Sequence, residues 1–156
     1  MARFGGPGVT GLSCSIGNSR YDAPYTDLFP EGTWTHVACT DDGTTLRIFI
    51  AGVERQTVSV SGGTGPVHPS IYVGRSQDGT IDEVRVWNVA TSSSELVGTM
   101  YTQLVGNEPG LAGYWRFNEG AGQVVTDASP NHCDGYLGTS PDVDAIDPTW
   151  SSDAPF

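Results

Sequence analysis

The sequence predicts an all-β fold with one short helix. Short apolar runs with period-two alternation lie between turn residues, and 21 of the 156 residues are glycine and 10 are proline, a composition typical of a chain with many turns and short strands. The Asp42-Gly43 dipeptide separates two β-rich runs and predicts a hairpin. Helical spacing of apolar residues occurs once, near residues 92–104.

Strands account for most of the chain before the helix. The patterns predict them at 11–16, 34–40, 45–50, 53–60, 70–74 and 81–87, with an edge strand at 21–28 that Pro24 interrupts. In the run 81–87, alternation places Glu83 and Arg85 on one face and Val84 and Val86 on the other. Glu83 and Arg85 are therefore expected to form a same-face ion pair.

The helix has both a start and a stop signal. Ser92 and Glu95 have the spacing of a capping box, and Leu96, Met100 and Leu104 recur at intervals of four, so that one apolar stripe can pack on the sheets. Gly106 would end it. Further strands are expected at 111–117 and 123–126, and the tail from residue 138 onward should wrap the surface without regular structure.

The length indicates one domain. A chain of 156 residues can bury roughly two-thirds of its unfolded surface, enough for an ordinary core. Residues 1–10 are Gly-rich and are expected to form an irregular lead-in, and residues 11–156 a single domain.

The charge balance excludes several partners. Seven Lys and Arg residues against eighteen Asp and Glu give a net charge of −11, which repels nucleic acid and anionic membranes. No apolar run approaches the roughly 18 residues that a membrane span needs, and the first seven residues lack the apolar core of a signal peptide. We therefore expect neither nucleic-acid binding nor membrane insertion.

Three cysteines lie far apart at positions 14, 39 and 133. None has C-x-x-C spacing, so a zinc site is not expected, and at most one disulfide can form. Cys14 and Cys39 both fall in predicted strands. We interpret them as small buried hydrophobic residues, and a bond between them stays open because the sequence does not give their separation.

The sequence gives little support for a catalytic site. No serine stands in a Gly-x-Ser-x-Gly elbow, and His36 lies mid-strand, where a packed structural role is favoured. A retaining glycosidase needs two carboxyl groups about 5 Å apart across the sugar. Glu83 is a candidate for one, and the strand that holds it has no second, so an enzyme is the minor alternative.

Two kinds of ligand contact stand out instead. Carboxylates at predicted turns and strand ends, from Asp41 to the run Asp142-x-Asp144-x-x-Asp147, could supply the hard oxygen ligands that calcium prefers. Flat aromatic rings stack on pyranose faces. Most of the tryptophans and phenylalanines lie in alternating strands and are expected in the core. This leaves four aromatic candidates for exposure, Tyr72, Tyr101, Tyr136 and Trp150, of which we select Tyr72, Tyr136 and Trp150 as ligand-binding residues.

Several ordered blocks resemble one family. They are 32–38 (GTWTHVA), 46–52, 71–75, 79–88 and 114–120, followed by segments at 107–115, 134–137 and 149–155. Together they are similar to the laminin-G-like jelly rolls of the concanavalin A-like lectin and glucanase superfamily. The resemblance implies an antiparallel two-sheet jelly-roll sandwich, usually extracellular or at the cell surface, that binds carbohydrate or an extracellular protein. Members of this family often hold a calcium ion at the rim of the sandwich, and we select Asp82, Glu119 and Asp127 as its candidate ligands.

The resemblance departs at the front of the chain. Family members begin with further strands for which there is no room before residue 11, about a third of the usual domain. A truncated frame, strands supplied by a second copy, or a compact variant would each account for this. We therefore expect a non-enzymatic recognition module, with a self-associating structural or adhesive subunit, a homo-oligomer, as the alternative.

Overall fold

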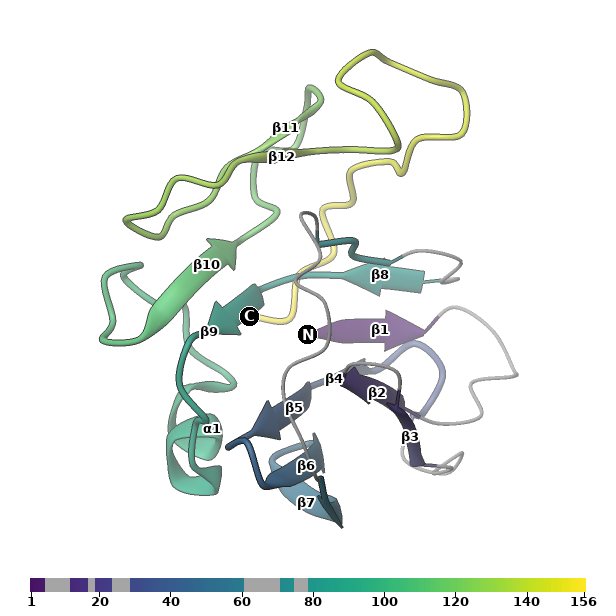
Figure 1. The fold of residues 1–156 in the computed structure, drawn as a ribbon. Coiled ribbons are helices and arrows are strands. Elements are labelled where there is room, and N and C mark those ends of the chain that lie inside the picture. Colours follow the sequence, from purple (N-terminus) through teal and green to yellow (C-terminus); the bar gives the residue numbers. More distant parts are fainter. Residues whose placement is uncertain (5–11, 17–18, 24–28, 61–70, 75–78) are drawn as a thin grey trace. The chain divides into compact units, whose positions relative to one another are not determined.

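The computed structural model describes residues 1–4, 12–16, 19–23, 29–60, 71–74 and 79–156. Its regular elements are antiparallel strands and one short helix (Figure 1), which confirms the all-β expectation. The chain forms two compact units: Met1–Ile81 with Ala90–Met100, and Asp82–Val89 with Tyr101–Phe156. That residues 11–156 act as a single domain stays a prediction. Among the described residues, no helix is long and apolar enough to cross a bilayer.

In the first unit, the start of the chain is a strand. β1 (Ala2–Phe4) pairs on one side with β4 (Trp34–Thr35) and on the other with β8 (Gly79–Ile81). Ala2 is buried in a cluster with Phe29 and Ile50. The irregular lead-in predicted for residues 1–10 is therefore wrong for residues 2–4, because three residues are too few to show a period in the sequence; residues 5–10 lie outside the described part.

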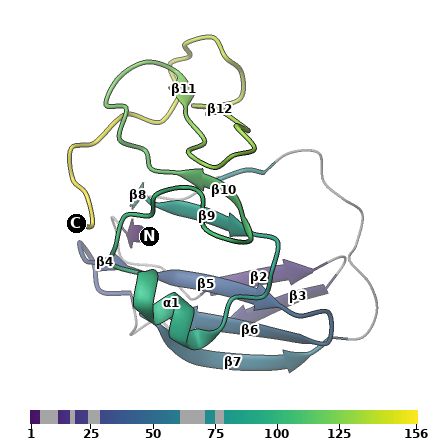
Figure 2. The ribbon, with the colours of Figure 1, turned by 90° about the vertical axis from the view of Figure 1, so that its left-hand side faces the viewer.

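A three-stranded meander forms a second sheet of this unit. β5 (Val37–Asp41), β6 (Thr45–Ile50) and β7 (Val53–Ser59) lie side by side, with β6 in the centre (Figure 2). Four apolar side chains of β6, at positions 46, 48, 49 and 50, are almost fully buried. The Asp42-Gly43 hairpin is confirmed. The Asp42 carboxylate accepts backbone N–H groups of Thr44 and Thr45 at 3.0 and 2.8 Å, which fixes the turn.

A disulfide joins two parts of the same unit. The hairpin of β2 (Leu12–Ile16) and β3 (Ser19–Ala23) carries Cys14, which is bonded to Cys39 of β5 with 6.4 Å between the Cα atoms. The interpretation of these cysteines as unbonded hydrophobic residues is thus wrong. The sequence places each in a strand but cannot place the two strands beside each other. Cys133 is a free, exposed thiol.

The helix is shorter than predicted. α1 spans Ser93–Thr99 and begins with the expected capping box, in which the Glu95 N–H donates to the Ser92 hydroxyl. It ends at Thr99, with Met100 as its C-cap, and not at residue 104. Gly98, Thr99 and Thr102 have low helix propensity, and residues 101–105 belong to the other unit. Leu96 is buried as predicted, whereas Leu104 is buried in a different cluster.

The strand expected at 70–74 is absent from the part of it that the structure describes. Residues 71–74 belong to no ladder, and the side chains of Ile71, Tyr72 and Val73 are 61%, 73% and 42% exposed. Their period-two pattern is therefore not matched by burial. A strand needs a paired neighbour, which a single-segment pattern cannot reveal.

The second unit contains two separate strand pairs. β9 (Val84–Trp87) pairs with β10 (Leu111–Trp115), and β11 (Val124–Val125) pairs with β12 (Gly135–Tyr136). The single strand predicted over 81–87 is broken at Asp82 and Glu83. Glu83 has φ of 55°, a left-handed conformation that interrupts the ladder. Leu104, Leu111 and Tyr114 form this unit's core, with Trp87 and Ala128 packed against it.

Candidate functional site

The segment from Val124 to Ser129 alternates between an outer and an inner face. Val125, Asp127 and Ser129 are 4%, 1% and 0% exposed, whereas Val124 and Thr126 are exposed and Ala128 is half-buried. Successive side chains of an extended chain point to opposite faces. The outer face of this segment therefore consists of residues 124, 126 and 128.

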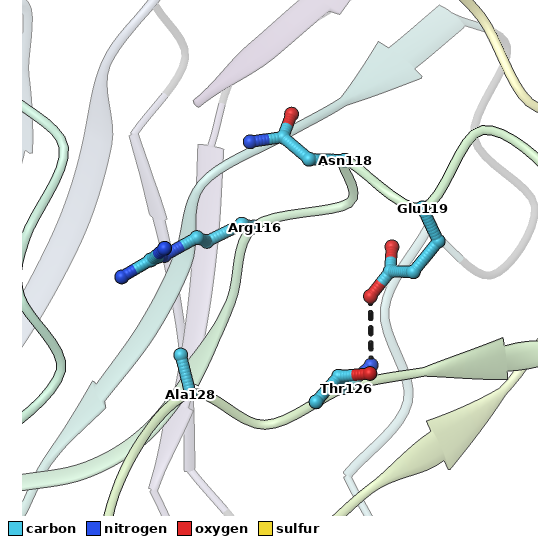
Figure 3. Close-up of a pocket in the computed structure, with 5 residues that line it drawn as sticks. All are labelled: Arg116, Asn118, Glu119, Thr126 and Ala128. Carbon is cyan, nitrogen blue, oxygen red and sulfur yellow. Dashed lines mark hydrogen bonds between the residues drawn. The ribbon is translucent and has the colours of Figure 1, made fainter.

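An open pocket lies on the outer face. It has a volume of about 280 Å³, and its lining residues are Arg116, Asn118, Glu119, Thr126 and Ala128 (Figure 3). Asn118 and Glu119 come from the turn that follows β10, where Phe117 has φ of 55°. Glu119 Oε1 accepts the backbone N–H of Thr126 at 2.8 Å, and this hydrogen bond ties the turn to the far wall.

Arg116 lines the pocket with its stem and turns its charge elsewhere. Its Nη2 donates to the carbonyl oxygens of Leu104 and Val105 at 2.8 and 3.0 Å. The guanidinium carbon lies 5.1 Å from the centre of the Tyr114 ring, which is the geometry of a cation–π contact. Figure 3 shows the side chain extending away from Glu119 and Thr126.

Glu83 is part of a buried network with Arg85 and Tyr114. Its Oε2 accepts the Arg85 Nη2 at 2.8 Å and the Tyr114 hydroxyl at 2.5 Å. The side chains of the ion pair are 4% and 9% exposed. The predicted ion pair is confirmed, but it is buried and not on the surface. Burial, with the hydrogen bond to Glu83, raises the pKa of Tyr114.

Asp127 is a structural carboxylate. Its Oδ1 accepts the backbone N–H groups of Tyr114 and Ser129, both at 2.8 Å. Its Oδ2 accepts the Ser129 hydroxyl at 2.8 Å and the Cys133 N–H at 2.9 Å. Burial alone would raise the pKa of Asp127, but these hydrogen bonds outweigh it and hold the pKa below its usual value. Four donors occupy the oxygens that a metal ion would need.

The three predicted metal ligands are not gathered into a binding cluster. Within the described part of the chain, no three His, Cys, Asp or Glu side chains form a group that could hold a metal ion. Glu119 faces the pocket, whereas Asp127 lies on the inner face of its segment. Asp82 is buried and accepts the Glu83 N–H at 2.7 Å, and burial raises its pKa to about 6. This set does not fit a calcium site, and calcium binding stays a prediction.

Two of the three predicted aromatic residues contact β11 or the turn before it, and neither lines the pocket. Tyr136 is 48% exposed and stands opposite Val124 in the β11–β12 ladder, so both side chains lie on the same face. Trp150 is half-buried, and its Nε1 donates to the Gly122 carbonyl at 2.8 Å, within the turn between Glu119 and β11. Tyr72 belongs to the first unit and stays a separate candidate.

Sequence reasoning missed most of the pocket. Asn118, Thr126 and Ala128 were not selected, although the first stands beside the selected Glu119. A signal for the other two was present, because the predicted strand at 123–126 extends by alternation to Ala128. What the sequence did not show is that the turn after β10 folds back onto this segment.

Comparison with known proteins identifies the class. The family model described as concanavalin A-like lectin/glucanases superfamily, Laminin_G_3, matches residues 3–97. The match covers more than half of the chain, and the protein therefore belongs to this family, as the sequence blocks predicted. The pocket residues, 116 to 128, lie beyond the matched segment. No curated protein matches the chain.

One solved structure is similar to this fold. It is that of a "putative carbohydrate binding protein" from Bacteroides ovatus ATCC 8483, with a TM-score of 0.60 and 24% sequence identity. The similarity covers 77% of this chain and 38% of the other. At this identity the likeness concerns the fold alone. The chain spans well under half of that protein's length.

Proposed function

We propose that this protein is a non-enzymatic carbohydrate-binding module whose ligand occupies the pocket beside β11. The observation that carries the proposal is the alternation of residues 124–128. It directs Thr126 and Ala128 into the pocket and sets Val124 beside Tyr136 on the same face. The polar side chain of Thr126 and the aromatic ring of Tyr136 thus lie on the same side of this segment. Membership of a family that contains lectins supports the same function.

The pocket chemistry suits sugar hydroxyls. A hydroxyl both donates and accepts, and the Asn118 amide can do both, while Glu119 accepts. Tyr136 offers a flat apolar face of the kind that stacks on a pyranose ring. The pocket is smaller than most drug-sized sites, so we expect it to hold one sugar unit of a longer glycan.

The state of Glu83 supports a binding role and not hydrolysis. A glycosidase carboxyl group must reach the scissile bond. Glu83 is 7% exposed, and its Oε2 is engaged by both Arg85 and Tyr114. We infer that this carboxylate holds the fold together, so incubation with β-glucans should release no reducing ends.

Isothermal titration with neutral oligosaccharides tests the proposal, using glucan, xylan and mannan fragments. Asn118→Ala should weaken the binding of the best ligand at least tenfold, because it removes hydrogen bonds worth about 1.4 kcal/mol or more together. Asn107→Ala changes an exposed amide outside the pocket and should leave the affinity unchanged. Equal losses in both variants, or no binding by any of these fragments, would contradict the proposal.

Tyr136 has its own matched control. Tyr136→Ala should weaken binding several-fold if the ring stacks on the sugar, whereas Tyr101→Ala, which removes a ring that is also about half exposed, should not. Trp150→Phe removes the indole N–H that holds the Gly122 turn. We expect a smaller loss from Trp150→Phe, because that residue supports the pocket wall.

Calcium dependence, location and assembly belong to the same proposal. Titrations in calcium chloride and in EDTA test whether binding depends on calcium, as the family resemblance implies.

The Cys14–Cys39 disulfide favours an oxidising compartment and so an extracellular or cell-surface location. The alternative, a self-associating subunit, predicts a dimer or larger species by sedimentation equilibrium, and a monomer would argue against it.

A further inference from the structure

The second unit is strongly acidic. Of the chain's eighteen carboxylate side chains, ten belong to residues 82–89 and 101–156, together with two of its seven cationic side chains. Those two are Arg85 and Arg116. The charge that a ligand meets at the pocket therefore depends on where the guanidinium groups of these two arginines lie.

Both arginine side chains form hydrogen bonds within the second unit. Arg85 is ion-paired with Glu83 and also donates to the Thr102 carbonyl. Arg116 donates to two carbonyls of the same segment, those of Leu104 and Val105. Their guanidinium carbons lie 5.4 and 5.1 Å from the centre of the Tyr114 ring. Arg85 thus fastens Thr102 to β9, and Arg116 fastens Leu104 and Val105 to the end of β10. The Arg116 side chain extends away from Glu119 (Figure 3).

Glu119 is the carboxylate that lines the pocket. It is exposed, and its Oε1 is fixed by the Thr126 N–H. Among the described residues, its Oε2 accepts no hydrogen bond and its carboxylate pairs with no cation. One oxygen is therefore held in place while the other remains available to a ligand donor. Such a preorganised carboxylate favours an ammonium donor over a neutral hydroxyl, because the ammonium group adds the Coulomb attraction of an ion pair to the hydrogen bond.

We propose that the pocket binds a sugar unit that carries a protonated primary amine, a non-acetylated amino sugar, and that Glu119 is the residue that determines this preference. The ammonium group pairs with Glu119 Oε2, and Asn118 binds a neighbouring hydroxyl. Uronic acids are rejected, because their carboxylate would face Glu119 with no cation turned toward it. This inference rests on the proposed carbohydrate binding and names its ligand class.

Three oligosaccharides of equal length separate the possibilities: β-1,4-linked glucosamine, the same oligomer N-acetylated, and an oligogalacturonate. At low salt we expect the glucosamine oligomer to bind at least fivefold more tightly than the acetylated oligomer, and the oligogalacturonate to show no measurable binding. The preference should shrink as salt rises, because screening weakens a partly exposed ion pair. Isothermal titration gives all three affinities.

Two variants distinguish a specific carboxylate from the overall acidity of the protein. Glu119→Gln keeps an oxygen for the Thr126 N–H but removes the charge, so this variant should bind the glucosamine oligomer and the acetylated oligomer with equal affinity. Glu31→Gln makes the same change in net charge at an exposed position of the first unit and should keep the preference. Thermal unfolding of both variants verifies that each is folded.

The outcomes are separable from those of the proposed function. If Glu119→Gln and Glu31→Gln reduce the preference equally, or wild type shows none, the amino-sugar assignment is overturned while neutral-glycan binding through Asn118 can still hold. If no oligosaccharide, neutral or cationic, binds wild type, then the carbohydrate-binding function itself fails.

Discussion

The carboxylate of Asp127 accepts a hydrogen bond of 2.8 Å from the backbone N–H of Tyr114, thirteen residues earlier on β10. The Ala128 N–H returns a hydrogen bond of 2.8 Å to the Tyr114 carbonyl, and Trp115 bridges Asp127 in an antiparallel pair. These contacts hold residues 124–129 extended beside β10. The alternation that forms the pocket wall therefore depends on a carboxylate that faces away from the pocket.

Asp127→Asn should destabilise the protein by about 2–4 kcal/mol, because one acceptor oxygen becomes an NH₂ group and buried donors lose their partner. Asp142→Asn is the matched control, since Asp142 is exposed in the same unit, and it should change stability by less than about 0.5 kcal/mol. Urea unfolding measures both. Equal effects of the two substitutions would show that Asp127 does not organise the segment.

Features set by near neighbours in the chain could be predicted. The Asp42-Gly43 hairpin and the Ser92–Glu95 capping box each lie within a few residues and follow from turn and capping chemistry. The Glu83–Arg85 pair also forms between near neighbours, but Glu83 lies just outside β9 with a left-handed φ, so the pair does not arise from the strand alternation that predicts it. The roles of Tyr136 and Trp150 as aromatic candidates also came from the sequence, and their ligand contacts stay predictions.

Features that depend on distant segments could not be predicted. Asp127 reads as a surface carboxylate at a turn until Tyr114, Ser129 and Cys133 are seen to surround it. The left-handed conformation of Glu83 interrupts a run whose period-two pattern is intact. The early end of α1 at Thr99 follows from residues 101–105 packing in the second unit, which overrides the apolar spacing that extends to Leu104.

The Tyr114 hydroxyl connects two buried groups. It donates to Glu83 Oε2 at 2.5 Å and accepts the Leu104 N–H at 3.1 Å. Tyr114→Phe removes the hydroxyl that both groups contact. The free energy of unfolding should fall by about 1–3 kcal/mol, because a buried carboxylate and a buried N–H each lose a hydrogen bond. Tyr101→Phe changes an exposed hydroxyl and should be neutral in the same thermal or urea unfolding experiment. A neutral Tyr114→Phe would mean that water replaces the hydroxyl.

The Cys14–Cys39 disulfide should contribute about 3.5 kcal/mol, from the loop-closure entropy of cysteines that are 25 residues apart. Replacing both with serine should lower the unfolding midpoint, whereas Cys133→Ser should leave it unchanged. Alkylation followed by mass measurement gives an independent test. One thiol should react in unfolded protein without reductant and three with it, and three reactive thiols without reductant would contradict the bond.

Asp82 should make stability fall as pH rises from about 4 through about 6. Burial raises its pKa from 3.8 to about 6, so the folded state binds a proton that the unfolded chain has already released. Its contribution is therefore fully present below pH 3.8 and is lost as pH rises through about 6.

Asp82→Asn keeps an oxygen for the Glu83 N–H and carries no charge. At pH 7.5 this variant should be more stable than wild type by on the order of 2 kcal/mol, and near pH 4 the two should be alike. Asp42 gives the opposite sign, because the Arg47 side chain and the Thr44 hydrogen bonds lower its pKa, so its contribution is lost in acid. Urea unfolding across this pH range measures the difference, and a constant gap between Asp82→Asn and wild type would show that Asp82 does not titrate in this window.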